Sequence, residues 1–172
     1  HRAYQLDPSA QGTGLAVEHL AQKYGKSIDE ALAMMQNVSD VAASVGLNYQ
    51  LAQTHHGNTR LAHQLIAAAQ SVGLGHALLK RLFSAHFEQA LPVFSADDLR
   101  PHALAVGMAA DLVERALATD EYAEEVDRDI AIGNQIGVQS VPTFVLDMKA
   151  GVVGAQPTEV LLGALRQVAA GQ

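Results

Sequence analysis

The chain has 172 residues, of which 49% are hydrophobic and 17% charged, and its formal net charge is −7 at pH 7. This composition is typical of a globular protein of one domain or two small ones, long enough to bury a core. The negative charge argues against nucleic acid as a partner, because phosphate binding needs a basic surface. The sequence has no cysteine, which excludes disulfides and thiol chemistry within these residues. No apolar run is long enough to cross a membrane, so we expect no membrane partner.

The N-terminal part predicts one strand and then helices. Residues 2–6 alternate in character and precede a proline turn, which is typical of a short strand. Residues 15–24 have helical periodicity. Ser27 and Glu30 have the spacing of a capping box, which predicts a second helix that ends near Gly46.

The middle of the chain predicts a long helical block. Further helices are expected over residues 60–72, 75–90, 109–118 and 120–136. Ser95 with the acidic residues after it predicts another helix start. Because Pro101 would lie deep inside that helix, the helix either begins later or is kinked there. Thr119 is expected to cap the helix over residues 120–136.

The segment 137–157 predicts a strand, a hairpin, a second strand and a final helix. Pro142 cannot donate to a sheet ladder, so it belongs at the beginning or edge of a strand, and it is a candidate for a cis peptide bond. Phe144 is a strand former. The turn is expected around Gly151, and Pro157 is expected in the first turn of the final helix.

At these residues the chain resembles a known family. The run SVPTF at 140–144 is similar to the cis-proline segment of thioredoxin-fold, DsbA-like oxidoreductases, and GAQ at 154–156 is similar to the ending of the FrnE-like subgroup. The pattern NTxxAH at 58–63 and YQLDP at 4–8 agree with it. The resemblance covers nearly the whole chain.

The resemblance implies an α/β thioredoxin-like fold with a large all-helical insertion. Residues 1–13 and 119–172 would form the thioredoxin-like part, and residues 14–118 the inserted domain. In such proteins a strand, a Cys-x-x-Cys turn and a helix, roughly 40 residues, come first, and this N-terminal unit is absent here. Because a lost strand exposes an apolar sheet edge, we expect that strand to be supplied by residues outside these 172 or by a neighbouring chain in a homodimer.

The resemblance also implies roles around the proline. Pro142 would be cis and face the redox cysteines, while the backbone of Val141 would pair with an extended substrate peptide. Ser140, next to them, is assigned to substrate binding. The alternative interpretation is an ordinary proline that begins a strand after a tight turn.

A second candidate set lies in the helical block. Asn58 and Thr59 either cap a helix or line the active-site cleft, where free N–H groups at a helix start would hold an anionic group such as the carboxylate of glutathione or of a substrate. His63 is assigned to the same cleft. His55 and His56 with His63 suggest a metal site, but adjacent histidines point apart and no spaced partner completes a tetrahedron, so we expect no metal.

Three functions are compatible with these residues. The resemblance favours a thiol–disulfide oxidoreductase or isomerase, with protein or small-molecule disulfides as substrates, no resident cofactor and a cytoplasmic location. One alternative is a glutathione-dependent isomerase or transferase of the hydroxychromene-carboxylate isomerase or kappa type, with serine at the first cysteine position. The other is a redox-silent module that binds peptides or a partner. This cysteine-free chain alone is not expected to be redox-active.

Overall fold

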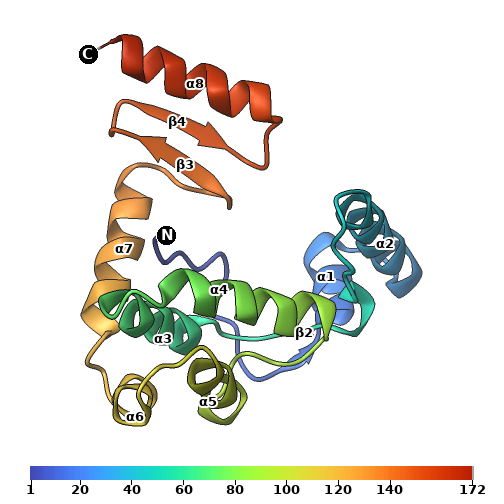
Figure 1. The fold of residues 1–172 in the computed structure, drawn as a ribbon. Helices are drawn as coiled ribbons and strands as arrows, with labels where there is room; N and C mark the ends of the chain where they lie inside the picture. Colours follow the sequence, from blue (N-terminus) through green and yellow to red (C-terminus); the bar gives the residue numbers. More distant parts are fainter. Residues whose placement is uncertain (172) are drawn as a thin grey trace. The chain divides into compact units, whose positions relative to one another are not determined.

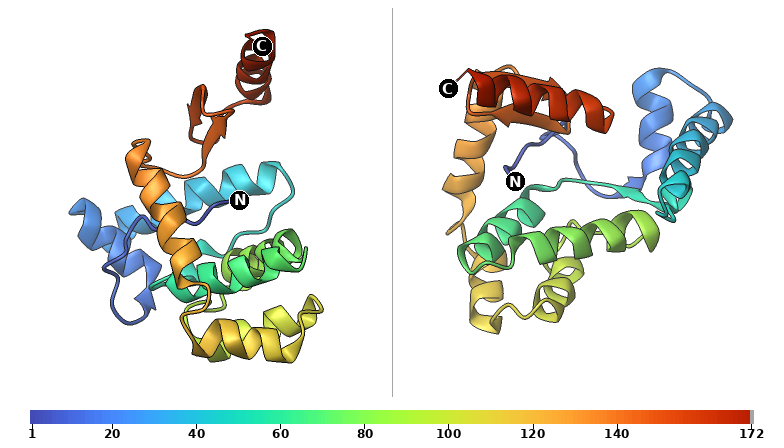
Figure 2. Two further views of the ribbon diagram at one scale, coloured as in Figure 1. Left: turned by 90° about the vertical axis from the view of Figure 1, so that its left-hand side faces the viewer. Right: turned by 45° about the horizontal axis from the view of Figure 1, so that its top comes forward.

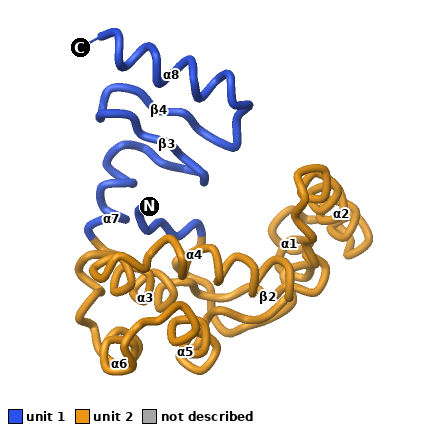
Figure 3. Tube along the Cα trace, viewed as in Figure 1, with its two compact units in different colours: residues 1–6, 128–172 blue, residues 7–127 orange. Residues whose placement is uncertain are grey.

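A computed structural model describes residues 1–171, which divide into two compact units (Figures 1 and 3). The helical unit comprises residues 7–127, and the terminal unit comprises residues 1–6 with the residues from 128 onward. The sequence analysis placed this division at residues 13/14 and 118/119. Residues before 128 belong with the helices because Tyr122 packs against their core and Asp127 accepts hydrogen bonds of 2.6 and 2.9 Å from Arg60.

The helical unit contains most of the helices of the chain. Its elements are β1 (Gly14–Leu15), α1 (Ala16–Tyr24), α2 (Ile28–Ser44), the 3-10 turn η1 (Leu51–Gln53), β2 (His55–His56), α3 (Arg60–Ser71), α4 (Gly75–Phe83), the π-helical turn η2 (Ser84–Glu88), α5 (Ala96–Ala105), α6 (Ala110–Ala118) and the start of α7 (Ala123–Gln135). None of the helices within residues 1–171 is both long and apolar enough to span a membrane.

Helices α1 and α2 form a pair with a small core of its own, and they lie side by side in both views of Figure 2. The predicted capping box is confirmed: Ser27 N donates to Glu30 Oε2 at 2.8 Å, and Glu30 N donates to Ser27 Oγ at 3.2 Å. Gly25 ends α1 with a φ of 62°, a conformation that glycine adopts without strain. Val17, Ala21 and Met35 are buried between the two helices.

The larger core lies among α3, α4, α5 and α6. Small alanine side chains let these helices pack closely, and leucines fill the centre. The buried members are Ala62, Leu65, Ala68, Ala69, Leu78, Leu82, Ala85, Val93, Leu99, Ala103, Met108, Leu112, Val113, Ala116 and Leu117. The helices predicted at 60–72 and 109–118 are therefore confirmed, and the one predicted at 75–90 continues from α4 into η2.

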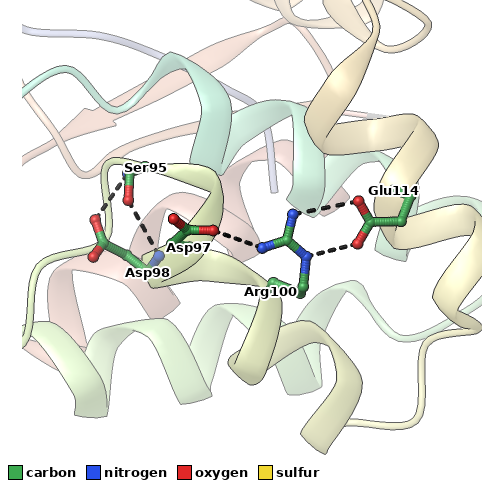
Figure 4. A network of polar contacts seen from close by, with 5 residues as sticks. All are labelled: Ser95, Asp97, Asp98, Arg100 and Glu114. Carbon is green, nitrogen blue, oxygen red and sulfur yellow. Dashed lines mark hydrogen bonds and ion pairs between the residues drawn. The ribbon is translucent and has the colours of Figure 1, made fainter.

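Helix α5 begins where its cap predicts. Ser95 Oγ accepts from the N–H of Asp98 at 3.2 Å, and Ser95 N donates to Asp98 Oδ2 at 2.9 Å (Figure 4). Pro101 lies inside α5, so the helix does not begin later to avoid it. Arg100 links α5 to α6 through hydrogen bonds of 2.6 and 3.3 Å to the carboxylate of Glu114 (Figure 4).

Helix α7 begins later than predicted. The sequence placed its start at residue 120, next to a Thr119 cap, but the helix begins at Ala123. The residues before it form a turn in which Thr119 Oγ1 accepts a 3.3 Å hydrogen bond from the N–H of Glu121. The threonine therefore caps a local turn and not the helix itself.

The terminal unit contains a hairpin covered by a helix. Strands β3 (Thr143–Leu146) and β4 (Ala150–Val153) are antiparallel, and α8 (Thr158–Ala170) lies along them (Figure 1). The prediction that the hairpin turns around Gly151 is wrong, because this glycine pairs with Val145 inside the ladder. The turn is made by Asp147 and Met148, which have φ values of 49° and 54°. Left-handed φ at two successive residues is typical of a tight hairpin turn.

The strand predicted at residues 2–6 is also wrong. The segment has no strand partner in the described part of the chain and is held by contacts with α7 and with Val138, which lies beyond the end of that helix. Ala3 N donates to Asp129 Oδ2 at 2.9 Å, and Tyr4 Oη donates to the carbonyl of Val138 at 2.6 Å. Alternating residues form a strand only where a neighbouring strand completes the ladder.

Candidate functional site

The first candidate site is the step into β3, in the terminal unit. The peptide bond between Val141 and Pro142 is cis. The ladder of β3 and β4 begins one residue later, with the Thr143–Val153 pair, and the carbonyl of Pro142 accepts a 2.8 Å hydrogen bond from the N–H of Gly154. Val141 is therefore outside the ladder, and it is 50% exposed.

The turn in front of this step is ordered by its own polar groups. Thr143 Oγ1 donates to the carbonyl of Ser140 at 2.7 Å, which closes the turn around Val141 and Pro142. Ser140 is half-buried, whereas Val141 and Pro142 are exposed. The segment thus leaves Val141 and Pro142 exposed on the surface of their unit, immediately before β3.

Apolar side chains remain uncovered on this unit. In the described residues, β3 and β4 pair only with each other. Phe144 and Val145 on β3 are 38% and 40% exposed, although both are strand residues that a larger sheet would bury. Helix α8 has no buried residue in spite of its apolar sequence. A two-stranded hairpin with one helix leaves these faces in water.

The second candidate set lies at the start of α3, in the helical unit. Asn58 Oδ1 accepts a 2.9 Å hydrogen bond from the N–H of Arg60, and Asn58 Nδ2 donates to the carbonyl of Pro8 at 3.1 Å. The side chain of Thr59 makes no capping hydrogen bond, although this residue stands at the N-cap position. His63 is half-buried one turn into the helix. The side chain of Asn58 therefore accepts the hydrogen bond of the first backbone N–H of α3, and it does so through a local turn.

A shallow hollow lies beside Asn58 on the same unit. Its volume is about 430 Å³, and it is lined by Asn58, Arg60, Leu61, Gln64, Phe94, Leu117, Ala118, Thr119 and Asp120. Thr59 and His63 do not line this hollow. Of the three residues predicted to line a cleft, Asn58 therefore lies at a concave surface, whereas Thr59 and His63 do not line it.

The histidines are arranged differently from what the sequence suggested. His56 stands next to Asp7 and His19, with possible ligand atoms of the three side chains all within 4.8 Å of one another, and His63 is not part of this group. His55 is not part of this group. Sequence reasoning missed Asp7 and His19 as neighbours of His56. Asp7 is 12 residues from His19, and His19 is 37 residues from His56, and neither spacing predicts that the side chains meet.

A comparison with known families decides the identity of the fold. The family model of the DSBA-like thioredoxin domain matches residues 1–166 of this sequence. The chain belongs to the DSBA-like thioredoxin family. The expected α/β thioredoxin-like fold with a helical insertion is confirmed by this match.

A solved structure supports the same assignment. The crystal structure of a probable DsbA oxidoreductase from Streptomyces coelicolor is similar, with a TM-score of 0.94 and 35% sequence identity. The similarity covers 100% of this DSBA-like chain and 75% of the Streptomyces chain. The comparison with curated proteins gave no match. Membership of the FrnE-like subgroup stays a prediction.

Proposed function

We propose that this DSBA-like chain is part of a thiol–disulfide oxidoreductase or isomerase whose redox cysteines lie on a Cys-x-x-Cys segment outside these 172 residues. The observation that carries the proposal is the exposed Val141–Pro142 step at the start of β3, in a chain that matches the DSBA-like family. The 35% identical Streptomyces protein, named a probable DsbA oxidoreductase, supports the same class of reaction.

The uncovered apolar surface supports a further strand and helix. Phe144 and Val145 on β3, and Val160, Leu162 and Leu165 on α8, are between 38% and 53% exposed. Packing a strand–helix unit against such faces would remove this area from water, at roughly 25 cal/mol for each Å² of apolar surface. A segment that carries the redox turn at the end of its strand would gain its stability from these contacts.

The proposed chemistry is thiol–disulfide exchange. The thiolate of the first cysteine, with its pKa lowered at a helix N-terminus, attacks one sulfur of a substrate disulfide. A mixed disulfide forms while the second substrate sulfur leaves as a thiolate. The second cysteine then attacks the mixed disulfide, which releases the reduced substrate and leaves the two enzyme sulfurs joined. Two electrons pass from the enzyme dithiol to the substrate, and the reverse sequence oxidises a substrate dithiol.

Within this chain, Val141 and Pro142 are proposed to contact the substrate. The N–H and C=O of Val141 would pair with an extended peptide, as in strand addition, because the β3–β4 ladder begins only after them. Ser140 would contact the same peptide. A role of Asn58, Thr59 and His63 in substrate binding stays a prediction. Protein and small-molecule disulfides are the proposed substrates; a cytoplasmic location and homodimerisation remain predictions.

The decisive experiment is the intact mass of the protein purified from its natural source, with mapping of the peptide that precedes His1. A mass well above 18.2 kDa and a Cys-x-x-Cys peptide are expected, together with insulin reduction that requires both cysteines. A serine at the first position would replace the proposal with a glutathione-dependent isomerase or transferase. A longer chain without either residue would leave a redox-silent binding module.

The role of Val141 has a separate test in the full-length protein. Val141→Pro removes the backbone N–H, while Val141→Ala keeps it and serves as the matched control. We expect Val141→Pro to raise KM for a peptide disulfide roughly 2- to 10-fold, the effect of one lost hydrogen bond. Turnover of a small disulfide without a peptide backbone should be the same in both variants. Equal KM values for the peptide in the two variants would contradict substrate pairing at Val141.

A further inference from the structure

A polar cluster in the helical unit has no part in the chemistry proposed above. Asp7 lies in the loop before β1, His19 on α1 and His56 on β2, and one donor atom from each lies within 4.8 Å of the other two. His56 Nε2 is 3.4 Å from Asp7 Oδ2. The imidazole rings of His19 and His56 are stacked, with centroids 3.5 Å apart and planes 10° from parallel.

The backbone around the cluster fixes these positions. In the β1–β2 ladder, His56 is paired with Gly14, which directly precedes Leu15 and the start of α1. The N–H of Ala16, the first residue of α1, donates to the carbonyl of Thr54 at 2.9 Å. Gly14 and Ala16, at the entry to α1, are therefore each tied to the segment of Thr54 and His56. As a result, His19 stands over His56 although 37 residues separate them along the chain.

The carboxylate of Asp7 is oriented by its own loop. Ser9 Oγ and Ser9 N donate to Asp7 Oδ1 at 2.8 and 3.2 Å. These bonds leave the other oxygen, Oδ2, directed at His56. In metal sites, hydrogen bonds of this kind to a ligating carboxylate hold it in position and are part of the site.

The nitrogen of His56 that faces the carboxylate is shielded from solvent and has no well-directed hydrogen bond in the described part of the chain. A buried polar atom without a partner costs free energy, so its position requires an explanation. A cation between the imidazole nitrogens and the carboxylate oxygen would satisfy it. The side chains of His56 and Asp7 are each only 29% exposed, so little water competes at this point.

We propose that Asp7, His19 and His56 bind one divalent transition-metal ion of the Zn²⁺ type. Two imidazoles and one carboxylate are a ligand set that Zn²⁺ takes in proteins, with a fourth position left for water. Bonds of about 2.0–2.1 Å place tetrahedral donors roughly 3.3 Å apart. The 3.4 Å between His56 Nε2 and Asp7 Oδ2 already matches this spacing. The rings of His19 and His56 are stacked in the structure, so binding requires the His19 ring to turn out of the stack and direct a nitrogen at the ion.

Two of the proposed ligands have shifted proton affinities. Burial lowers the pKa of His19, and the neighbouring His56 acts in the same direction. The hydrogen bond from Ser9 is the main cause that lowers the pKa of Asp7. The ion would act as a structural clamp that joins the loop at residue 7, α1 and β2.

The test is binding of Zn²⁺ to the tag-free protein after removal of metal with a chelator. We expect one ion per chain by titration calorimetry, and visible Co²⁺ absorption that reports a low-coordinate nitrogen and oxygen site. His19→Gln and His56→Gln should each weaken binding at least about tenfold, and Ser9→Ala, which removes only the outer hydrogen bond, by about tenfold. His76→Gln, on the exposed side of α4, is the matched control and should bind as the wild type does.

The wild-type protein gives an independent readout. Addition of Zn²⁺ should shift the imidazole NMR signals of His19 and His56 and leave that of His76 unchanged. The proposal is overturned if no stoichiometric ion binds, if His76→Gln weakens binding as much as His56→Gln does, or if Zn²⁺ shifts all histidine signals alike. Because this readout uses no variant, a poorly folded substitution cannot obscure the result.

Discussion

The ring of Tyr4 lies directly against the backbone of Gly133 on α7. A β-carbon at Gly133 would lie 2.8 Å from Tyr4 Cδ2 and 3.0 Å from Cε2, which is closer than side chains tolerate. The hydroxyl of the same ring donates to the carbonyl of Val138 at 2.6 Å and lies 3.1 Å from Asn134 Oδ1. The first residues of the chain are thus fastened to the second half of α7 by one aromatic side chain.

Replacing Gly133 by alanine should therefore destabilise the protein. The overpacked ring costs about 1–3 kcal/mol, against a gain of about 1 kcal/mol from the better helix former. Gly163→Ala on α8 is the matched control, because a β-carbon there meets no atom within 4 Å. It should stabilise by about 0.5–1 kcal/mol. Urea unfolding of both variants measures the difference, and a Gly133→Ala variant as stable as Gly163→Ala would disprove the contact.

Asp129 should matter more to stability than its ion-pair partner. Its side chain is 8% exposed, accepts from the N–H of Ala3 at 2.9 Å and pairs at 3.1 Å with Arg2, which is 79% exposed. Asp129→Ala leaves the N–H of Ala3 without this acceptor and should cost about 1–3 kcal/mol. Arg2→Ala removes only an exposed pair and should cost less than about 1 kcal/mol.

The measurement for Asp129 combines urea unfolding with limited proteolysis at the N-terminus. Asp129→Ala should release the segment 1–6 to protease faster than Arg2→Ala does, because the backbone hydrogen bond is the stronger anchor. Asp129→Asn keeps an acceptor for Ala3 and should lie between the two. The interpretation fails if Arg2→Ala is as damaging as Asp129→Ala.

His86 should make stability fall in mild acid. Burial lowers its pKa, with a further contribution from His55, and its ring lies against Phe87 and Phe94 with centroids 4.8 and 5.8 Å away. The unfolded chain then binds the proton at a higher pH than the folded chain does. Stability is therefore fully present above the unfolded value of about 6.5 and is lost as the pH falls toward the lower folded pKa.

The check is the unfolding free energy from pH 7.5 to 5 for wild type and His86→Gln. The variant should lose less stability across this range. The slope of its unfolding free energy against pH should be smaller than that of the wild type by the equivalent of up to one bound proton. His19 and His102, whose pKa values burial also lowers, remain in both proteins and cancel in the comparison. An equal change from His76→Gln, which removes an exposed imidazole, would contradict the assignment.

Two leucines on α5 should differ in their contribution to the core. Leu99 is 0% exposed inside the large core of the helical unit, whereas Leu104 is 44% exposed on the same helix. Leu99→Ala opens a cavity and should cost about 2–5 kcal/mol. Leu104→Ala should cost less than about 1 kcal/mol, because little packing is lost. Thermal unfolding distinguishes the two, and similar melting temperatures would contradict the core described here.

Helix starts were predictable because their signals are local. The capping boxes at Ser27 and Ser95 form within four residues, so the sequence contains every group that takes part. The hairpin turn was misplaced because glycine is the usual signal for left-handed φ, while here Asp147 and Met148 adopt it and Gly151 is paired in β4. The family motif around Val141 and Pro142 predicted the candidate site, since its residues are adjacent in the chain.

The sequence by itself determined the order of the helices, their caps, the hairpin and the family, because each depends on neighbouring residues or on one short motif. Only the tertiary structure decided that residues 2–6 lie against α7 as an unpaired segment, since a strand requires a partner that no local pattern specifies. It also decided that His56 meets Asp7 and His19. That meeting depends on the pairing of Gly14 with His56, a contact between segments whose spacing along the chain contains no signal.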